Sequence, residues 1–211
     1  MPGNLLASWR ERETVLAALF LVILTSVALR PEIRGYDGGG NYAYLMSLLQ
    51  EGDLDFHNEY RALDAFRDAP YKMINLPHSE ITGRWSNQFG FGAALFWAPA
   101  VVAVHLGSVL LSPTSANFLS SPYVWAVALS SALWTSLGLL LLLRRLKREF
   151  GSATALHTTA GMLLATPLFF YGWMHGSMSH GVGFFVAVVL LLQLERTAGS
   201  GSARHMLGLG L

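Results

Sequence analysis

The sequence predicts an all-α, polytopic transmembrane protein whose long first outer loop, on the periplasmic side, contains juxtamembrane helices. Charged residues make up 13% of the chain, about half the share that is usual in soluble domains, and the mean hydropathy is +0.42. Several apolar runs approach the roughly 20 residues that a helix needs to cross a bilayer. The formal net charge of +1 gives no sign of a nucleic-acid partner, and a chain without cysteine has no disulfide or thiolate metal site.

We expect residues 1–211 to form a single membrane domain, the N-terminal part of a longer chain. The predicted parts are a transmembrane helix at 14–29, an outer loop at 30–122 that includes an interfacial helix at 89–111, transmembrane helices at 123–143, 153–173 and 181–194, and the start of a further transmembrane helix at 206–211. The last of these, MLGLGL, is too short to cross a bilayer and therefore predicts more chain.

The basic run Arg144–Arg148 sets the predicted orientation, because cytoplasmic loops are enriched in Lys and Arg. If 89–111 lies in the interface, the N-terminus and this run are both cytoplasmic and the acid-rich loop is outside. Pro99 favours this interpretation, since proline removes a backbone hydrogen bond from a helix. The alternative is a spanning 89–111 with the upstream orientation reversed.

Segment 14–29 leaves a second alternative open. Ser26-Val27-Ala28 offers small residues at the spacing of a signal-peptidase site. The preceding SWRERE is balanced in charge rather than basic, which favours a retained signal anchor. Both interpretations place the long loop outside.

Asp37 is the main candidate for chemistry in that loop. It stands before three glycines and an amphipathic helix, in GYDGGGNYAYLMSLLQ. An N-cap would explain the aspartate alone. Three glycines cost helix propensity of about 1 kcal/mol each, and we expect them to leave room for a substrate at the backbone.

Further polar residues of the outer segments fall into three groups. Asp53, Asp55 and Glu59 could bind a hard cation or form a solvated turn. Lys72, His78, Arg84 and Gln88 precede the interfacial helix and could hold a phosphate or snorkel to the membrane surface. His175 and His180 lie at the two ends of the short turn between 153–173 and 181–194, where they could serve as phosphate donors or acid–base groups, or as members of an interfacial belt.

The chain resembles the GT-C class of integral-membrane glycosyltransferases, and within it bacterial members similar to mannosyltransferases and the aminoarabinose transferase of lipid A. The residues that carry the resemblance are DGGGNYAYLMSLLQEGDLDFHNEY at 37–60, NQFGFGAALFWAP at 87–99, LRRLKR at 143–148 and ATPLFFYGWMHGSMSH at 165–180. The class has more helices than are predicted here, which again implies a longer chain.

The resemblance implies transfer of a sugar from a polyprenyl-phosphate donor to an acceptor at the outer face of a bacterial inner (plasma) membrane, with inversion. Asp37 would be the catalytic base. We expect substrate-binding roles for Tyr36, Tyr42, Asp53, Asp55, Glu59, Lys72, His78, Arg84, Gln88, His175 and His180. No cofactor is predicted: HGSMSH lacks the acidic ligands of the metal-dependent members, so a divalent cation is the less favoured alternative.

Two non-enzymatic functions remain as alternatives, a transporter or flippase for lipid-linked saccharides and an assembly subunit that binds a partner outside. A transporter is expected to carry ionisable residues within its spans, and 14–29, 123–143 and 181–194 have none. The bilayer and the lipid-linked donor are the predicted partners, and the sequence leaves the oligomeric state open.

Overall fold

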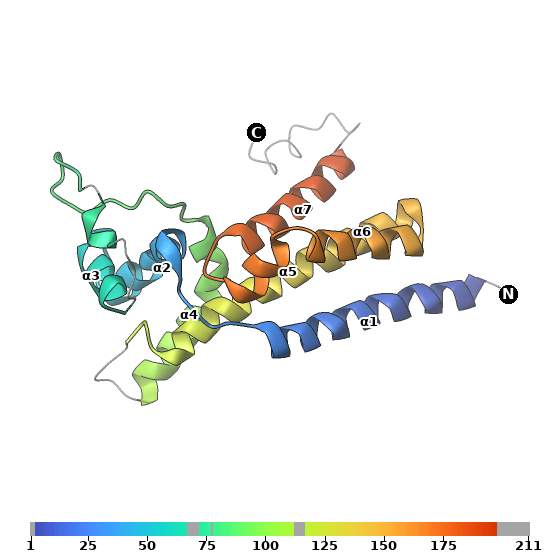
Figure 1. Ribbon diagram of the computed structural model, residues 1–211, viewed down its shortest axis with the longest axis horizontal. Coiled ribbons are helices and arrows are strands. Elements are labelled where there is room, and N and C mark those ends of the chain that lie inside the picture. Colours follow the sequence, from blue (N-terminus) through green and yellow to red (C-terminus); the bar gives the residue numbers. More distant parts are fainter. Residues whose placement is uncertain (1–2, 67–71, 77, 112–116, 198–211) are drawn as a thin grey trace.

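A computed structural model describes residues 3–66, 72–76, 78–111 and 117–197. The described residues form helices and loops without a β-strand, apart from one isolated bridge between His78 and Trp85. Figure 1 shows two regions, which we call the bundle and the cap. The bundle contains α1 (Gly3–Ala28), α5 (Ser121–Phe150), α6 (Ser152–Leu164), η2 (Phe170–Met174) and α7 (His180–Thr197). The cap contains α2 (Gly35–Gln50), α3 (His57–Phe66), η1 (Met73–Asn75) and the loop that leads to α4 (Gly92–Leu111).

Three described helices, α4, α5 and α7, are long and apolar enough to cross a membrane. The prediction of an all-helical fold is confirmed for the described residues, and these three helices are candidates for membrane spans. α5 has 30 residues, or about 45 Å at 1.5 Å per residue, and packs against α1, α4, α6 and α7. It is therefore the central helix of the molecule.

The predicted spans at 123–143 and 181–194 lie inside α5 and α7, and 14–29 lies in the second half of α1 and the residue after it. The segment 153–173 is different, because α6 ends at Leu164 and a π-helix begins at Phe170. Pro167 explains the break, since proline lacks an N–H and disfavours helical backbone in the residue before it. The Thr166 hydroxyl bonds to the carbonyl of Met162, 2.5 Å away, at this break. The predicted segment 206–211 lies outside the described residues.

α4 corresponds to the predicted interfacial segment 89–111. Its length and composition also permit a crossing, whereas in Figure 1 it runs obliquely to α1 at the end of the bundle that adjoins the cap. The indole of Trp97 donates to Ser131 Oγ at 2.8 Å, and His105 Nδ1 lies 3.1 Å from the hydroxyl of Tyr123. These bonds hold α4 against the first half of α5. An interfacial position stays a prediction.

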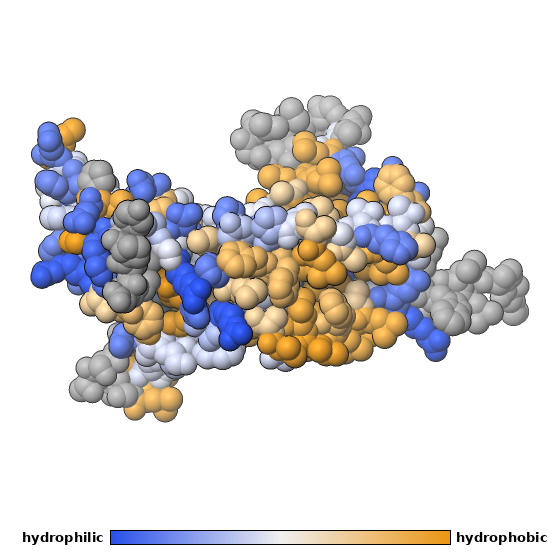
Figure 2. All heavy atoms as spheres, viewed as in Figure 1, coloured by the Kyte–Doolittle hydropathy of each residue, from blue (hydrophilic) through white to orange (hydrophobic). Residues whose placement is uncertain are grey.

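Charge is divided between the two ends of the bundle. Figure 2 shows apolar side chains over the middle of the bundle and hydrophilic ones over the cap and the opposite end. At that opposite end, Lys147 of α5 pairs with Glu13 of α1 at 2.6 Å, and Arg145 pairs with Glu195 of α7 at 2.5 Å. An apolar belt between two charged regions is the distribution expected of a membrane-embedded bundle.

The position of α4 can be tested with a reporter fused after Leu111. An interfacial α4 places the reporter on the same side as the cap, whereas a spanning α4 places it on the opposite side. Paired alkaline-phosphatase and green-fluorescent-protein fusions measure the side, with fusions after Gly52 as the reference for the cap. Opposite signals from the two positions would contradict the interfacial prediction.

The contact between α5 and α7 depends on Gly138. A Cβ added there would lie 2.9 Å from the Phe184 ring and 3.1 Å from the Cα of Phe185. We therefore expect Gly138→Ala to lower the free energy of unfolding by about 1–3 kcal/mol, measured in detergent by fluorescence. Gly107→Ala is the matched control, since nothing lies within 4 Å of its added Cβ and alanine is the better helix former. Equal destabilisation by both variants would contradict the packing argument.

Candidate functional site

The cap is attached to the bundle where the loop after α1 meets the turn between η2 and α7. The backbone N–H of Arg30 donates to the carbonyl of Trp173 at 2.8 Å, and that of Arg34 donates to Ser177 Oγ at 3.0 Å. Trp173 is fully buried, and its indole N–H donates to Thr25 Oγ1 of α1 at 2.9 Å. Residues 30–34 and 173–177, far apart in the sequence, are thus fixed against each other. We call this region the junction.

The glycines after Asp37 serve close packing. A Cβ on Gly38 would lie 2.4 Å from Ser177 Oγ, and one on Gly40 would lie 1.8 Å from the ring of Phe89. These two glycines therefore leave no room for a substrate, and the expectation that they do so was wrong. The space beside Gly38 is taken by the η2–α7 turn, so the glycine sets how closely α2 approaches that turn.

A polar pocket of about 310 Å³ opens at the junction, lined by Arg30, Glu32, Arg34, Phe170, Met174 and His175. Arg34 forms an ion pair with Glu32, and its Nη1 lies 3.3 Å from His175 Nε2. The ring of His175 stacks on Phe170 at 4.3 Å. Two guanidinium groups and one carboxylate leave the lining with an excess of positive charge.

Burial lowers the pKa of His175, and the neighbouring Arg34 lowers that pKa further, against a smaller opposing effect of Glu32. The imidazole is therefore neutral over more of the physiological pH range than a free histidine. Its Nδ1 is buried and has no hydrogen-bond partner among the described residues. A neutral imidazole can donate from one nitrogen and accept at the other.

Asp37 lies in the first turn of α2, three residues after the N-cap position, which is occupied by Arg34. Its side chain is exposed, and among the described residues it takes part in no hydrogen bond or ion pair. The alternative that Asp37 is an N-cap is therefore wrong. The carboxylate belongs to the same short segment as the arginines of the pocket and is free to contact a ligand.

Tyr36 and Tyr42, the two tyrosines of α2 that were predicted to bind substrate, form hydrogen bonds within the protein. Tyr36 is half-buried, and its hydroxyl donates to the carbonyl of Lys72 at 3.0 Å. Tyr42 is 0% exposed, and its hydroxyl donates to the carbonyl of Phe118 at 2.7 Å. Burial raises the pKa of Tyr42. Tyr42 has no exposed surface for a substrate, because α2 packs against α4 and the Tyr42 hydroxyl is bonded to the segment before α5.

The acids of the α2–α3 turn organise that turn. Asp53 Oδ1 accepts from Ser47 Oγ at 2.9 Å and from the backbone N–H of Asp55 at 3.2 Å. Asp55 Oδ1 accepts from the backbone N–H groups of His57 and Trp85, at 3.4 and 3.1 Å. In the part of the chain that the structure describes, no three acidic or histidine side chains are grouped to hold a metal ion.

Glu59 lies beneath this turn and is fully buried. Neither of its carboxyl oxygens has a hydrogen-bond partner of good geometry among the described residues. Burial raises its pKa to about 7, and the carboxylates of Glu51 and Asp53 contribute to the increase. We therefore expect the protonation of Glu59 to affect the stability of the cap.

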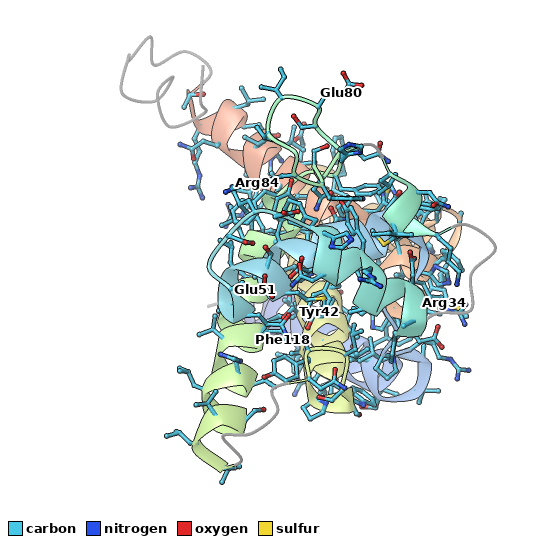
Figure 3. The ribbon with its side chains drawn as sticks, turned by 90° about the vertical axis from the view of Figure 1, so that its left-hand side faces the viewer. Arg34, Tyr42, Glu51, Glu80, Arg84 and Phe118 are labelled. Carbon is cyan, nitrogen blue, oxygen red and sulfur yellow. The ribbon has the colours of Figure 1, made fainter. Side chains whose placement is uncertain are left out.

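The remaining candidates do not line the pocket. His78 stacks on Trp85 at 5.2 Å, and Arg84 and Gln88 are exposed. Figure 3 shows Arg84 and Glu80 at the tip of the cap, well separated from Arg34. Lys72 Nζ donates to the carbonyl of Asp64 at 3.3 Å.

His180 is exposed at the start of α7, where its ring contacts Tyr171 at 4.1 Å. Of the predicted phosphate-binding residues, only His175 lines the pocket.

Sequence reasoning missed Arg30, Glu32 and Arg34. They follow an apolar helix directly, in ALRPEIRGYD, where charged side chains usually only mark the membrane surface. The available signal was their spacing before Asp37, with two arginines and an aspartate within eight residues. Their partner His175 is 141 residues from Arg34, so the pairing could not be derived from sequence distance.

Comparison with known proteins gave no match: no known family, no curated protein and no solved structure is detectably similar to this chain.

Glu59 can be tested through the pH dependence of stability. Its pKa is raised in the folded state, so protonation favours folding, and this contribution is lost as the pH rises through about 7. Between pH 5 and pH 8 we expect wild type to lose roughly 1–3 kcal/mol of unfolding free energy more than Glu59→Gln does. Denaturant titrations in detergent at several pH values measure this difference.

Glu80→Gln removes an exposed carboxylate of the same cap and is the control for Glu59→Gln. It should retain the pH dependence of wild type. If the stability of wild type and of both variants is equally independent of pH, the raised pKa of Glu59 is contradicted.

Proposed function

We propose that the chain belongs to a glycosyltransferase that moves a sugar from a polyprenyl-phosphate carrier to an acceptor hydroxyl at the outer face of the membrane. The observation that carries the proposal is the arrangement of the junction. An exposed, unpaired aspartate stands seven residues after Arg30 and three after Arg34, and both arginines line a pocket with a histidine of reduced pKa.

Asp37 would act as the general base. The acceptor oxygen attacks the anomeric carbon while its proton passes to the Asp37 carboxylate, and the bond from that carbon to the phosphate oxygen breaks. Attack from the side opposite the phosphate inverts the anomeric centre. A positioned base of this kind typically contributes about 10²–10⁴ to the rate. The carboxylate suits this role because no described side chain neutralises it.

The pocket would receive the phosphate of the departing carrier. Guanidinium groups match phosphate oxygens in geometry and charge, and Arg30 and Arg34 supply two of them. A neutral His175 could donate a hydrogen bond to the same oxygens. The proposal therefore assigns the charge of the leaving group to the protein's own cations and names no cofactor. The junction connects the cap to the bundle, and Figure 2 shows a hydrophilic cap beside an apolar middle of the bundle. Such a position suits a substrate with a polar head and a hydrocarbon tail.

The proposal is tested by donor cleavage in membranes that contain the protein. Membranes with wild type or Asp37→Asn are incubated with a panel of radiolabelled polyprenyl-phosphate sugars, and released polyprenyl phosphate is measured. We expect release by wild type and a loss of about 10²–10⁴ in rate for Asp37→Asn, with the amount of inserted protein unchanged. The asparagine keeps the size of the side chain and removes the base.

Glu80→Gln is the matched control, since it also converts one exposed cap carboxylate into an amide, and it should release carrier at the wild-type rate. Equal release by Asp37→Asn would contradict a catalytic role for this residue. Release from no donor would contradict the transferase and favour the transporter or the assembly subunit.

A further inference from the structure

The η2–α7 turn is held from two sides. On the side of the junction, Ser177 Oγ accepts from the backbone N–H of Arg34 at 3.0 Å, and His175 Nε2 lies 3.3 Å from Arg34 Nη1. On the other side the turn lies against α5, where a Cβ added to Gly176 would be 3.2 Å from the Cβ of Ser131. The position of the turn therefore depends on α5 as well as on the loop after α1.

Ser131 forms hydrogen bonds to two different segments. Its hydroxyl donates to the carbonyl of Gly176 and accepts from the indole N–H of Trp97 of α4 at 2.8 Å. Ser131 and Trp97 are both 0% exposed. A serine hydroxyl has a single hydrogen to donate, and because the indole is a donor, that hydrogen is left for Gly176. The result is a continuous chain of hydrogen bonds from α4 through α5 to the turn, and linked bonds of this kind strengthen one another.

Removal of this hydroxyl would leave the Trp97 N–H and the Gly176 carbonyl without the bond that each makes now. Both residues are buried, and a buried polar group without a partner is costly. A displacement of the turn that brings the Gly176 carbonyl to water relieves part of this cost. The residues on either side of Gly176 move with it, and they are the pocket histidine His175 and the acceptor Ser177.

We propose that Ser131 is a positioning residue of the junction pocket, which holds the η2–α7 turn where His175 meets Arg34. Ser131 does not line the pocket, so it acts through the turn. The charged groups around His175 all belong to the loop after α1, so a movement of the turn changes the distance of the imidazole from each of them. These groups are Arg30, Glu32 and Arg34. The part of Ser131 in sugar transfer rests on the proposed function, whereas its part in placing His175 does not.

The proposal is tested by the titration of His175, followed by nuclear magnetic resonance of the full chain in detergent with labelled histidine. The His175 signal is identified by its loss in His175→Gln. In Ser131→Ala we expect the pKa of His175 to rise toward that of a free histidine, because a displaced turn loses the burial and the nearby Arg34 that lower this pKa. Ser131→Cys keeps a weaker donor and acceptor and should titrate between wild type and Ser131→Ala.

Ser130→Ala is the matched control. Ser130 precedes Ser131 in α5 and is also buried, at 6% exposed, but among the described residues it has no hydrogen bond to the turn. Its variant should leave the titration of His175 unchanged. An unchanged titration in Ser131→Ala, or the same rise in Ser130→Ala, would overturn the proposal. If Ser131→Ala does not fold, Ser131→Cys decides, and a wild-type titration in that variant overturns the proposal.

Donor cleavage tests the consequence for transfer separately. With the radiolabelled polyprenyl-phosphate sugars we expect Ser131→Ala to lose roughly 10-fold to 10²-fold in rate, since small displacements of binding groups have effects of this size. Ser130→Ala should cleave the donor at the wild-type rate. A wild-type rate in Ser131→Ala would overturn the part of Ser131 in transfer. If wild type cleaves no donor, the transferase is contradicted, while the titration of His175 still decides whether Ser131 positions the turn.

Discussion

The two hydrogen bonds from the backbone of the loop after α1 are the constraint on which the junction depends. Their acceptors are the carbonyl of Trp173 and the hydroxyl of Ser177. Because the donors are backbone amides, they fix the path of residues 30–34 whatever side chains stand there. That path points the Arg34 side chain at His175 and starts α2 beside the η2–α7 turn, where only a glycine fits at position 38. The pocket and the place of Asp37 both follow from this attachment.

The long apolar helices could be predicted from the sequence because length and composition indicate them. α5 and α7 contain the predicted spans, since an apolar run of this length is far longer than a typical strand and favours a helix. The break after Leu164 was not predicted, although Pro167 was visible in the sequence. A hydropathy pattern does not register a single proline. The backbone does, because proline has no N–H to donate and a helical hydrogen bond is lost at that residue.

The candidate site could be predicted only in its local parts. Asp37 and His175 were found because each stands in a polar turn beside an apolar segment. The arginines of the pocket were missed, since their role depends on a contact with a residue about 140 positions away. Tyr42 is the converse case. It was predicted to bind substrate because it is close to Asp37 in the chain, but the helix places it on the packed face, where its hydroxyl bonds to the carbonyl of Phe118.

The two arginines of the junction pocket differ in what surrounds them, and this difference bears on the proposed function. Arg34 is paired with Glu32 and lies against His175, so a phosphate bound there would compete with a carboxylate for this guanidinium. Arg30 has no such ion pair among the described residues, and it supplies the excess positive charge of the lining. In the proposed transfer the carrier phosphate must leave in every cycle. The pairing of Arg34 with Glu32 would favour that release, while Arg30 would supply the attraction that brings the phosphate in.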